Sequence, residues 1–136
     1  MRVLIQSDSD VGALFKELEL LTNAAKLTLA NITVDESRNK ITIPMQRRAY
    51  ERKRFLLFGE RYKLVSSELI DSKLIIKNVV DCKIKDNLYF LEIQLLFGVA
   101  IKNKEIHLHS VEEQSGVTAF EMIIEVHSYD IELRDG

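Results

Sequence analysis

An alternation of apolar and polar residues runs through most of this chain and limits what it can fold into. From about residue 26 to the end, apolar side chains recur at every second position, and the longest series lies between Tyr89 and Ile101. A period of two places successive side chains on opposite faces of a β-strand. The sequence therefore predicts long strands, each with one buried and one solvated face.

One stretch near the N-terminus has the helical period instead. Its apolar residues recur every three or four positions, with charged residues between them: Val11, Leu14, Phe15, Leu18 and Leu21. Ser7 or Asp8 offers a side-chain oxygen to cap the first turn. We expect an amphipathic helix over 9–22, after a short strand over 2–6.

The remaining segments follow one another through short turns. The expected strands cover 27–34, 41–45, 62–85 (with one break), 89–101, 105–111 and 117–133, the last with a slip in register near Ser128. Because no second helical segment supplies a crossover, antiparallel pairing is expected. The predicted fold is a single α+β domain over 1–136. In it, an N-terminal helix packs on a long-stranded, curved antiparallel β-meander, as a half-barrel or barrel.

Composition bounds the class of protein. The chain has 136 residues, 46% of them hydrophobic, which suits one core. Its 19 basic and 21 acidic residues give a net charge of −2, which gives no reason to expect a nucleic-acid or membrane partner. We find no signal peptide and expect a cytoplasmic protein. The lone Cys82 lies in an alternating run and is interpreted as a small buried hydrophobe.

A basic cluster is the main candidate site. Its residues are Arg47, Arg48, Arg52, Lys53 and Arg54. Arginine makes bidentate hydrogen bonds to phosphate, so Arg47, Arg48, Arg52 and Arg54 are candidate ligand-binding residues. The alternative is a solvated strand end whose arginines pair with the acidic C-terminal region, and this alternative is favoured.

The spelling RRAYER at 47–52 resembles the RxxxR element of PilZ domains, which bind a cyclic dinucleotide on a β-barrel. The second element of that family, [D/N]xSxxG, does not follow downstream.

The histidines form the next candidate site. His107 and His109 project from one face of a predicted strand, with Glu105 beside them, and are weak candidates for metal ligands. The apolar residues Ile106 and Leu108 occupy the other face, so the favoured interpretation is an exposed polar face with both rings pointing into water, without a metal.

The familiar catalytic motifs are absent from the sequence, including GxSxG, phosphate-binding glycine loops and HExxH. We therefore expect a protein that is not an enzyme and uses no cofactor.

The region from residue 25 to the end resembles a small bacterial family of β-rich single-domain proteins of unknown function. The likeness rests on RRAYE at 47–51, followed by Arg52-Lys53-Arg54, and on the ending YDIELRDG at 129–136. The family has no assigned activity, so the resemblance implies only that Tyr50 and Glu51 share a structural role.

The sequence thus leads to one main functional hypothesis. Long strands with apolar faces, on a chain without catalytic motifs, favour a non-enzymatic binding module that associates with itself, as a homo-oligomer, or with a protein partner. The alternative is a β-barrel that binds a phosphate ligand or nucleotide through Arg47, Arg48 and Arg52.

Overall fold

In the computed structural model, residues 2–55, 59–86, 93–95, 99–111 and 118–136 are described. The chain is strand-rich, at 64% strand, and its strands form two antiparallel sheets. The helix is α1 (Asp8–Thr22), and the strands are β1 (Arg2–Ile5), β2 (Lys26–Thr28), β3 (Thr33–Asp35), β4 (Lys40–Phe55), β5 (Gly59–Ile76), β6 (Val79–Asp86), β7 (Ile93–Leu95), β8 (Val99–Lys102), β9 (Glu105–Val111), β10 (Thr118–Val126) and β11 (Ile131–Asp135). Two short 3-10 helices, η1 (Leu29–Asn31) and η2 (Glu36–Arg38), flank β3. The predicted α+β class is confirmed.

The first sheet, sheet A, has the order β1-β11-β5-β4-β2-β7, and β3 pairs with β4 on the same side as β2. The second sheet, sheet B, has the order β6-β10-β9-β8. The hairpins β4–β5, β8–β9 and β9–β10 join consecutive strands, as in a meander. Because β11 lies between β1 and β5, however, the full order is not a meander. Neither sheet closes on itself in the described part of the chain, so the predicted barrel is not confirmed.

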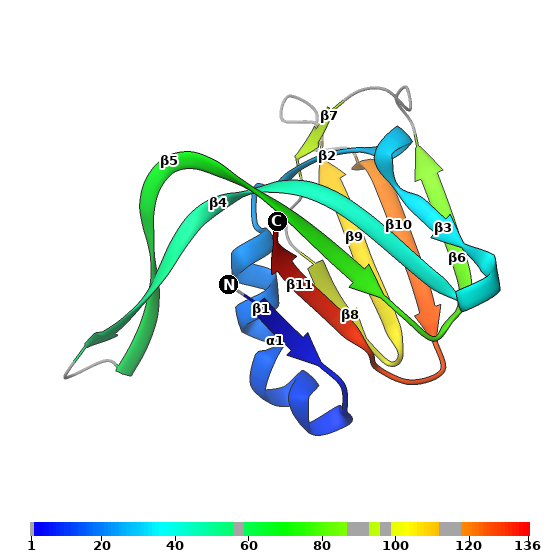
Figure 1. The fold of residues 1–136 in the computed structure, drawn as a ribbon, viewed down its shortest axis with the longest axis horizontal. Helices are drawn as coiled ribbons and strands as arrows, with labels where there is room; N and C mark the ends of the chain where they lie inside the picture. The colour runs from blue at the N-terminus through cyan, green and yellow to red at the C-terminus, as the bar shows by residue number, and fades with distance from the viewer. Residues whose placement is uncertain (1, 56–58, 87–92, 96–98, 112–117) are drawn as a thin grey trace.

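The two sheets enclose one core (Figure 1). It is formed by alternating side chains of the inner faces, for example Ile43 of β4 and Leu74 of β5 from sheet A, and Leu108 of β9 and Met122 of β10 from sheet B. The register places Ile43 opposite Leu74 and Met122 opposite Leu108, so apolar residues meet directly across neighbouring strands. Burial of these side chains is the main stabilising contribution.

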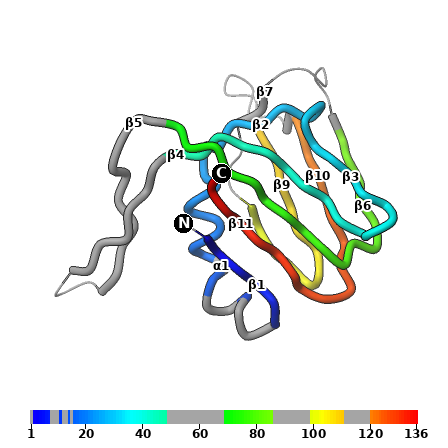
Figure 2. Tube along the Cα trace, in the orientation of Figure 1, coloured from blue at the N-terminus to red at the C-terminus, as the bar shows by residue number. Residues whose placement is uncertain are grey.

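Two of the chain's passages between the sheets, β5–β6 and β10–β11, lie at the same end (Figure 2). The β5–β6 passage turns at Asn78, whose positive φ of 58° is one that asparagine tolerates. The β10–β11 passage includes Ser128, and the Asn78 side-chain amide donates to the Ser128 hydroxyl at 2.9 Å. The segments 62–85 and 117–133, each expected as one strand with a break or a slip in register, are therefore each divided between the two sheets, at Asn78 and at Ser128.

Helix α1 fills one of the two openings between the sheets. It contacts β1 at the edge of sheet A and β8 at the edge of sheet B, and buries Leu18 and Leu21 in the core. The hydroxyl of Thr22 donates to the carbonyl of Leu18 at 2.8 Å and accepts the backbone N–H of Val99 at 2.9 Å, which ties the helix to sheet B. The helix observed over Asp8–Thr22 agrees with the predicted 9–22, and no helix in the described ranges is long and apolar enough to cross a membrane.

Candidate functional site

Arg47, the first residue of the basic cluster, lies on the inner face of β4. It continues the buried row of Ile43 and Met45 and is only 2% exposed. Its Nε donates to Oδ1 of Asp135 at 3.0 Å, and its Nη2 donates to Oδ2 of the same carboxylate at 2.8 Å. The Arg47 guanidinium is therefore held in a bidentate ion pair with the last strand.

Asp135 is anchored from a second side. The hydroxyl of Ser72, on β5, donates to its Oδ1 at 2.7 Å. Partial burial opposes ionisation of the carboxyl group, but the hydrogen bonds and positive charge of Arg47 and the hydrogen bond of Ser72 outweigh it and lower the pKa of Asp135 to about 2. The predicted pairing between the cluster and the acidic C-terminal region holds for Arg47. The expectation of a solvated strand end is wrong at this residue, because it is buried.

Among the other members of the cluster, Arg48 is the one whose side chain is described. Arg48 is half-buried, and strand alternation places it on the opposite face of β4. The backbone of Arg52 pairs with that of Tyr62, and the backbone of Arg54 pairs with that of Glu60. For 49–55 and 59–68 the structure describes the backbone alone, so it says nothing of the side chains of Arg52, Lys53, Arg54, Tyr50 and Glu51. The structure therefore does not bring the four candidate arginines together into one described site.

The histidines lie on the face that the alternation predicts, but the expectation that they point into water is wrong, because both are half-buried. His107 and His109 are half-buried on β9, opposite the fully buried Ile106 and Leu108. Nε2 of His107 is 3.6 Å from a carboxylate oxygen of Glu105. Over the described residues, no group of three histidine, cysteine or acidic side chains is arranged to hold a metal ion.

Cys82 is half-buried on β6, a less enclosed position than the sequence suggested. Burial and the negative charge of Asp81 raise the pKa of its thiol. A raised pKa leaves less thiolate at neutral pH and so lowers the nucleophilicity of the group.

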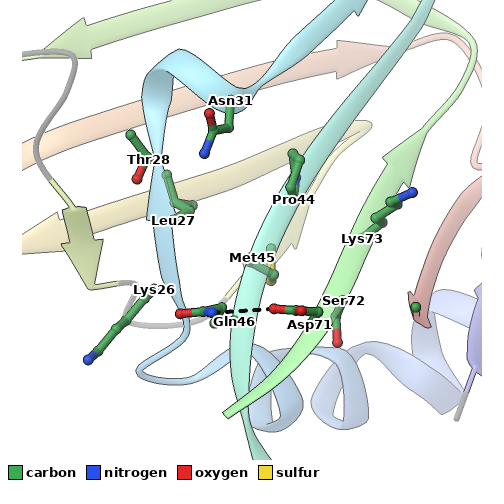
Figure 3. A pocket seen from close by; sticks show the side chains of 11 residues that line it. Lys26, Leu27, Thr28, Asn31, Pro44, Met45, Gln46, Asp71, Ser72 and Lys73 are labelled. Atoms are coloured by element: carbon green, nitrogen blue, oxygen red, sulfur yellow. Dashed lines mark hydrogen bonds between the residues drawn. The ribbon is translucent and has the colours of Figure 1, made fainter.

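A surface pocket of about 520 Å³ lies over β2, β4 and β5. Gln46 donates to Asp71 at 3.3 Å in its floor, and Lys26 and Lys73 stand at its two ends (Figure 3). The two lysine side chains point away from each other, so their charges do not converge on a common ligand (Figure 3). This pocket therefore offers no focused anion site.

A second groove, of about 390 Å³, lies at the opening between β3 and β6. Its lining includes Val34, Val80 and Ile84, which are 54%, 59% and 43% exposed, and these are the large hydrophobic side chains found exposed among the described residues. We call this opening, between β3 and β6, the open side. The sequence does not reveal this exposure, because Val80 and Ile84 continue the alternation of β5, and alternation alone places them on the same apolar face as Leu74.

Both walls of the open side are edge strands over the described residues. In the sheet orders above, β3 pairs only with β4, and β6 pairs only with β10. An edge strand presents unpaired backbone N–H and C=O groups, which can pair with another chain. The open side therefore combines exposed apolar side chains with two edge strands, in a groove that is also lined by Asp35, Glu36, Lys40 and Asp81. At the start of β6, the backbone N–H of Val79 already donates to the carbonyl of Asn39 at 3.0 Å.

Comparison of the chain with protein-family models, with curated proteins and with solved structures gave no match, so its function has to be inferred from its own residues.

Proposed function

We propose that this protein is a non-enzymatic binding module that holds another protein chain at the open side. The observation that supports this is the concentration of Val34, Val80 and Ile84 in one groove. Single exposed hydrophobic residues are ordinary on protein surfaces, whereas several in one groove indicate a contact surface. An extended chain can satisfy the edge of β6 with backbone hydrogen bonds and place apolar side chains in the groove.

The phosphate-ligand alternative has weaker support. The Arg47 guanidinium already makes two charge-assisted hydrogen bonds to Asp135, and a phosphate would have to displace that carboxylate from a buried position. Removing one partner of such a pair costs about 3–5 kcal/mol, which phosphate binding would have to offset. We therefore propose a structural role for Arg47.

The test is site-specific photo-crosslinking of the full chain in the cells that express it. A photo-reactive amino acid is placed at Val80, on the open side, and in a matched variant at Lys16, which is exposed on α1. Irradiation should give a discrete protein adduct from position 80 and none from position 16. Adding Ile84→Lys should remove the adduct, because it replaces an apolar contact of the groove with a charged side chain that the bound chain would have to desolvate.

Two results would count against the proposal. One is an adduct yield at position 80 no higher than at position 16. The other is an adduct that persists unchanged after Ile84→Lys, because contact would then not depend on the groove.

A further inference from the structure

The free edge of β6 has a sequence that is complementary to itself. Its central residues read Val80-Asp81-Cys82-Lys83-Ile84, with the apolar residues at even positions and the opposite charges at odd positions. The register with β10 places Cys82 opposite Ile124 and Ile84 opposite Met122, both of which are buried. The inner face of β6 is therefore the one that carries Cys82 and Ile84.

Val80 lies at an irregularity in the pairing with β10, and it is grouped with Cys82 and Ile84 by the groove that all three line. Val79 pairs with Val126 and Asp81 with Glu125, so Val80 is one extra residue on β6, as in a β-bulge. Its side chain lines the same groove as Cys82 and Ile84. The three apolar residues consequently share one surface.

An antiparallel copy of β6 can pair with this edge in one favourable register. With Cys82 opposite Cys82 of the second copy, Val80 faces Ile84 of the second copy, and Ile84 faces its Val80. On the outer face, Asp81 is then opposite Lys83 of the second copy, and this ion pair occurs twice. Apolar and opposite-charge pairs directly across strands are the ones that stabilise antiparallel pairing.

Neighbouring registers are worse for identifiable reasons. A shift of two residues in one direction places Lys83 opposite Lys83 of the second copy, although Asp81 and Lys85 then pair twice, and a shift in the other direction places Asp81 opposite its equivalent with no opposite-charge pair. Like charges directly opposite each other are destabilising. A shift of one residue puts the apolar row of one copy on the charged face of the other.

We propose that two copies of this chain associate through β6 in the register centred on Cys82, with a two-fold axis perpendicular to the sheet. This inference rests on the proposed function and names its partner as a second copy. The two B sheets become one continuous sheet of eight strands, four from each copy. The axis keeps both apolar rows on the same face, so Val80 and Ile84 of each copy are covered by their counterparts.

The lysines of β6 fit this arrangement. Lysine on an edge strand usually discourages pairing, because it would bring uncompensated charge against another strand. Here Lys83 meets Asp81 of the second copy, so the edge discriminates against unrelated strands and accepts its own sequence. Both residues are exposed, so substituting them leaves the core intact.

Charge reversal provides the main test, read as the dissociation constant from sedimentation equilibrium under reducing conditions. The wild type should form a dimer of twice 15.7 kDa at micromolar concentration. Asp81→Lys alone and Lys83→Asp alone should each weaken the dimer by about tenfold or more, since two attractive pairs become repulsive. The double variant D81K/K83D should recover most of the affinity, and an equimolar mixture of the two single variants should form heterodimers.

Mild oxidation provides the second test, because the chain has a single cysteine. Directly opposite residues of antiparallel strands have Cα atoms about 4.5 or 5.5 Å apart, within the range of about 4.4–6.8 Å that a disulfide spans. Cys82 should therefore form a covalent dimer in high yield. In the Cys82→Ser background, Asp81→Cys should cross-link with Lys83→Cys when the two are mixed. Glu125→Cys, exposed on the neighbouring strand, measures collisional cross-linking.

The outcomes separate this inference from the proposed function. If the protein is a monomer at all concentrations and Cys82 does not cross-link, the proposed dimer is wrong. If position 80 nevertheless gives a groove-dependent adduct with a different protein, the proposed binding function still holds. If the dissociation constant of the dimer does not change with the charge reversals, or if Cys82 cross-links no better than Glu125→Cys, the proposed register is wrong. Absence of every adduct at position 80 overturns both.

Discussion

Both openings between the sheets are bordered by strands with apolar residues, but one is filled by a helix and the other leaves apolar side chains exposed. At the β1/β8 opening, α1 buries Leu18 and Leu21, and Thr22 satisfies the backbone N–H of Val99. At the β3/β6 opening, Val80 and Ile84 remain exposed. An apolar strand face thus becomes core where the chain supplies a cover, and a contact surface where it does not.

Charged residues show a parallel contrast. Arg47 and Arg2 each pair with an acidic residue of β11, Arg47 with Asp135 at 2.8 Å and Arg2 with Glu132 at 3.1 Å. The Arg47 side chain is 2% exposed and the Arg2 side chain 61% exposed. A buried ion pair becomes costly when one partner is lost, whereas an exposed pair contributes little.

The largest effect is expected from removing core on the helix-filled side. Leu21→Ala should lower the free energy of unfolding by about 3 kcal/mol, because it deletes a fully buried side chain and leaves a cavity. Ile84→Ala, the matched change on the open side, should cost less than about 1 kcal/mol in the monomer. Urea denaturation of dilute protein measures both, and equal losses would erase the distinction between the two sides.

The matched arginine substitutions should differ almost as much. Arg47→Met leaves Asp135 without its cation and should destabilise the fold by about 3 kcal/mol. Arg2→Met removes an exposed pair and should cost about 0–1 kcal/mol. Thermal and urea unfolding provide the comparison, and a small effect of Arg47→Met would mean that its ion pair merely balances its desolvation.

Acidification should act through the same buried pair. The Asp135 carboxyl has a folded pKa of about 2, below its ordinary value of 3.8, so its contribution is present above the unfolded value and is lost as pH falls through the folded one. The full contribution is about 2 kcal/mol, of which about half should be lost by about pH 3. Between about pH 6 and about pH 3, the unfolding free energy of the wild type should fall more steeply than that of Asp135→Asn, because only the wild type loses this contribution. If the unfolding free energies of the two proteins fall with pH in parallel, the Arg47–Asp135 pair is excluded as the source of the acid sensitivity.

A smaller loss is expected at the junction of α1 and sheet B. Thr22→Val preserves shape but leaves the buried N–H of Val99 without its acceptor, and should cost about 1–2 kcal/mol. Thr42→Val makes the same chemical change at a half-buried position of β4 and serves as control. Faster hydrogen exchange of the Val99 amide in Thr22→Val would show that the stability is lost at this hydrogen bond. Unchanged exchange there would argue against a stabilising role for the bond between Thr22 and Val99.

Local features of the fold could be predicted because they depend on local periodicity. The helical period over 9–22 anticipated α1, and the alternation around Ile106 and Leu108 placed His107 and His109 on the opposite face. The break within 62–85 was also visible. These features follow from which side of a helix or strand each side chain occupies.

Non-local features could not be predicted in the same way. The sequence predicted that the basic cluster pairs with the acidic C-terminal region, but it did not show that Arg47 is buried or that its counterion is Asp135, 88 residues away. Likewise, the alternation joins Leu74 and Ile84 in one series, although the turn at Asn78 puts Leu74 in sheet A and Ile84 at the edge of sheet B. A period of two records the face of a strand and contains no information about the neighbour it pairs with.

The sequence by itself therefore determined the strand-rich α+β character, the helix and the buried face of most strands. Only the tertiary structure decided that α1 fills one opening between the sheets, and that Val34, Val80 and Ile84 line the other. The physical reason is that burial depends on what covers a face as well as on the residues in it. The alternation that first identified the strands thus leaves β6 with an apolar row that its own chain does not fully cover.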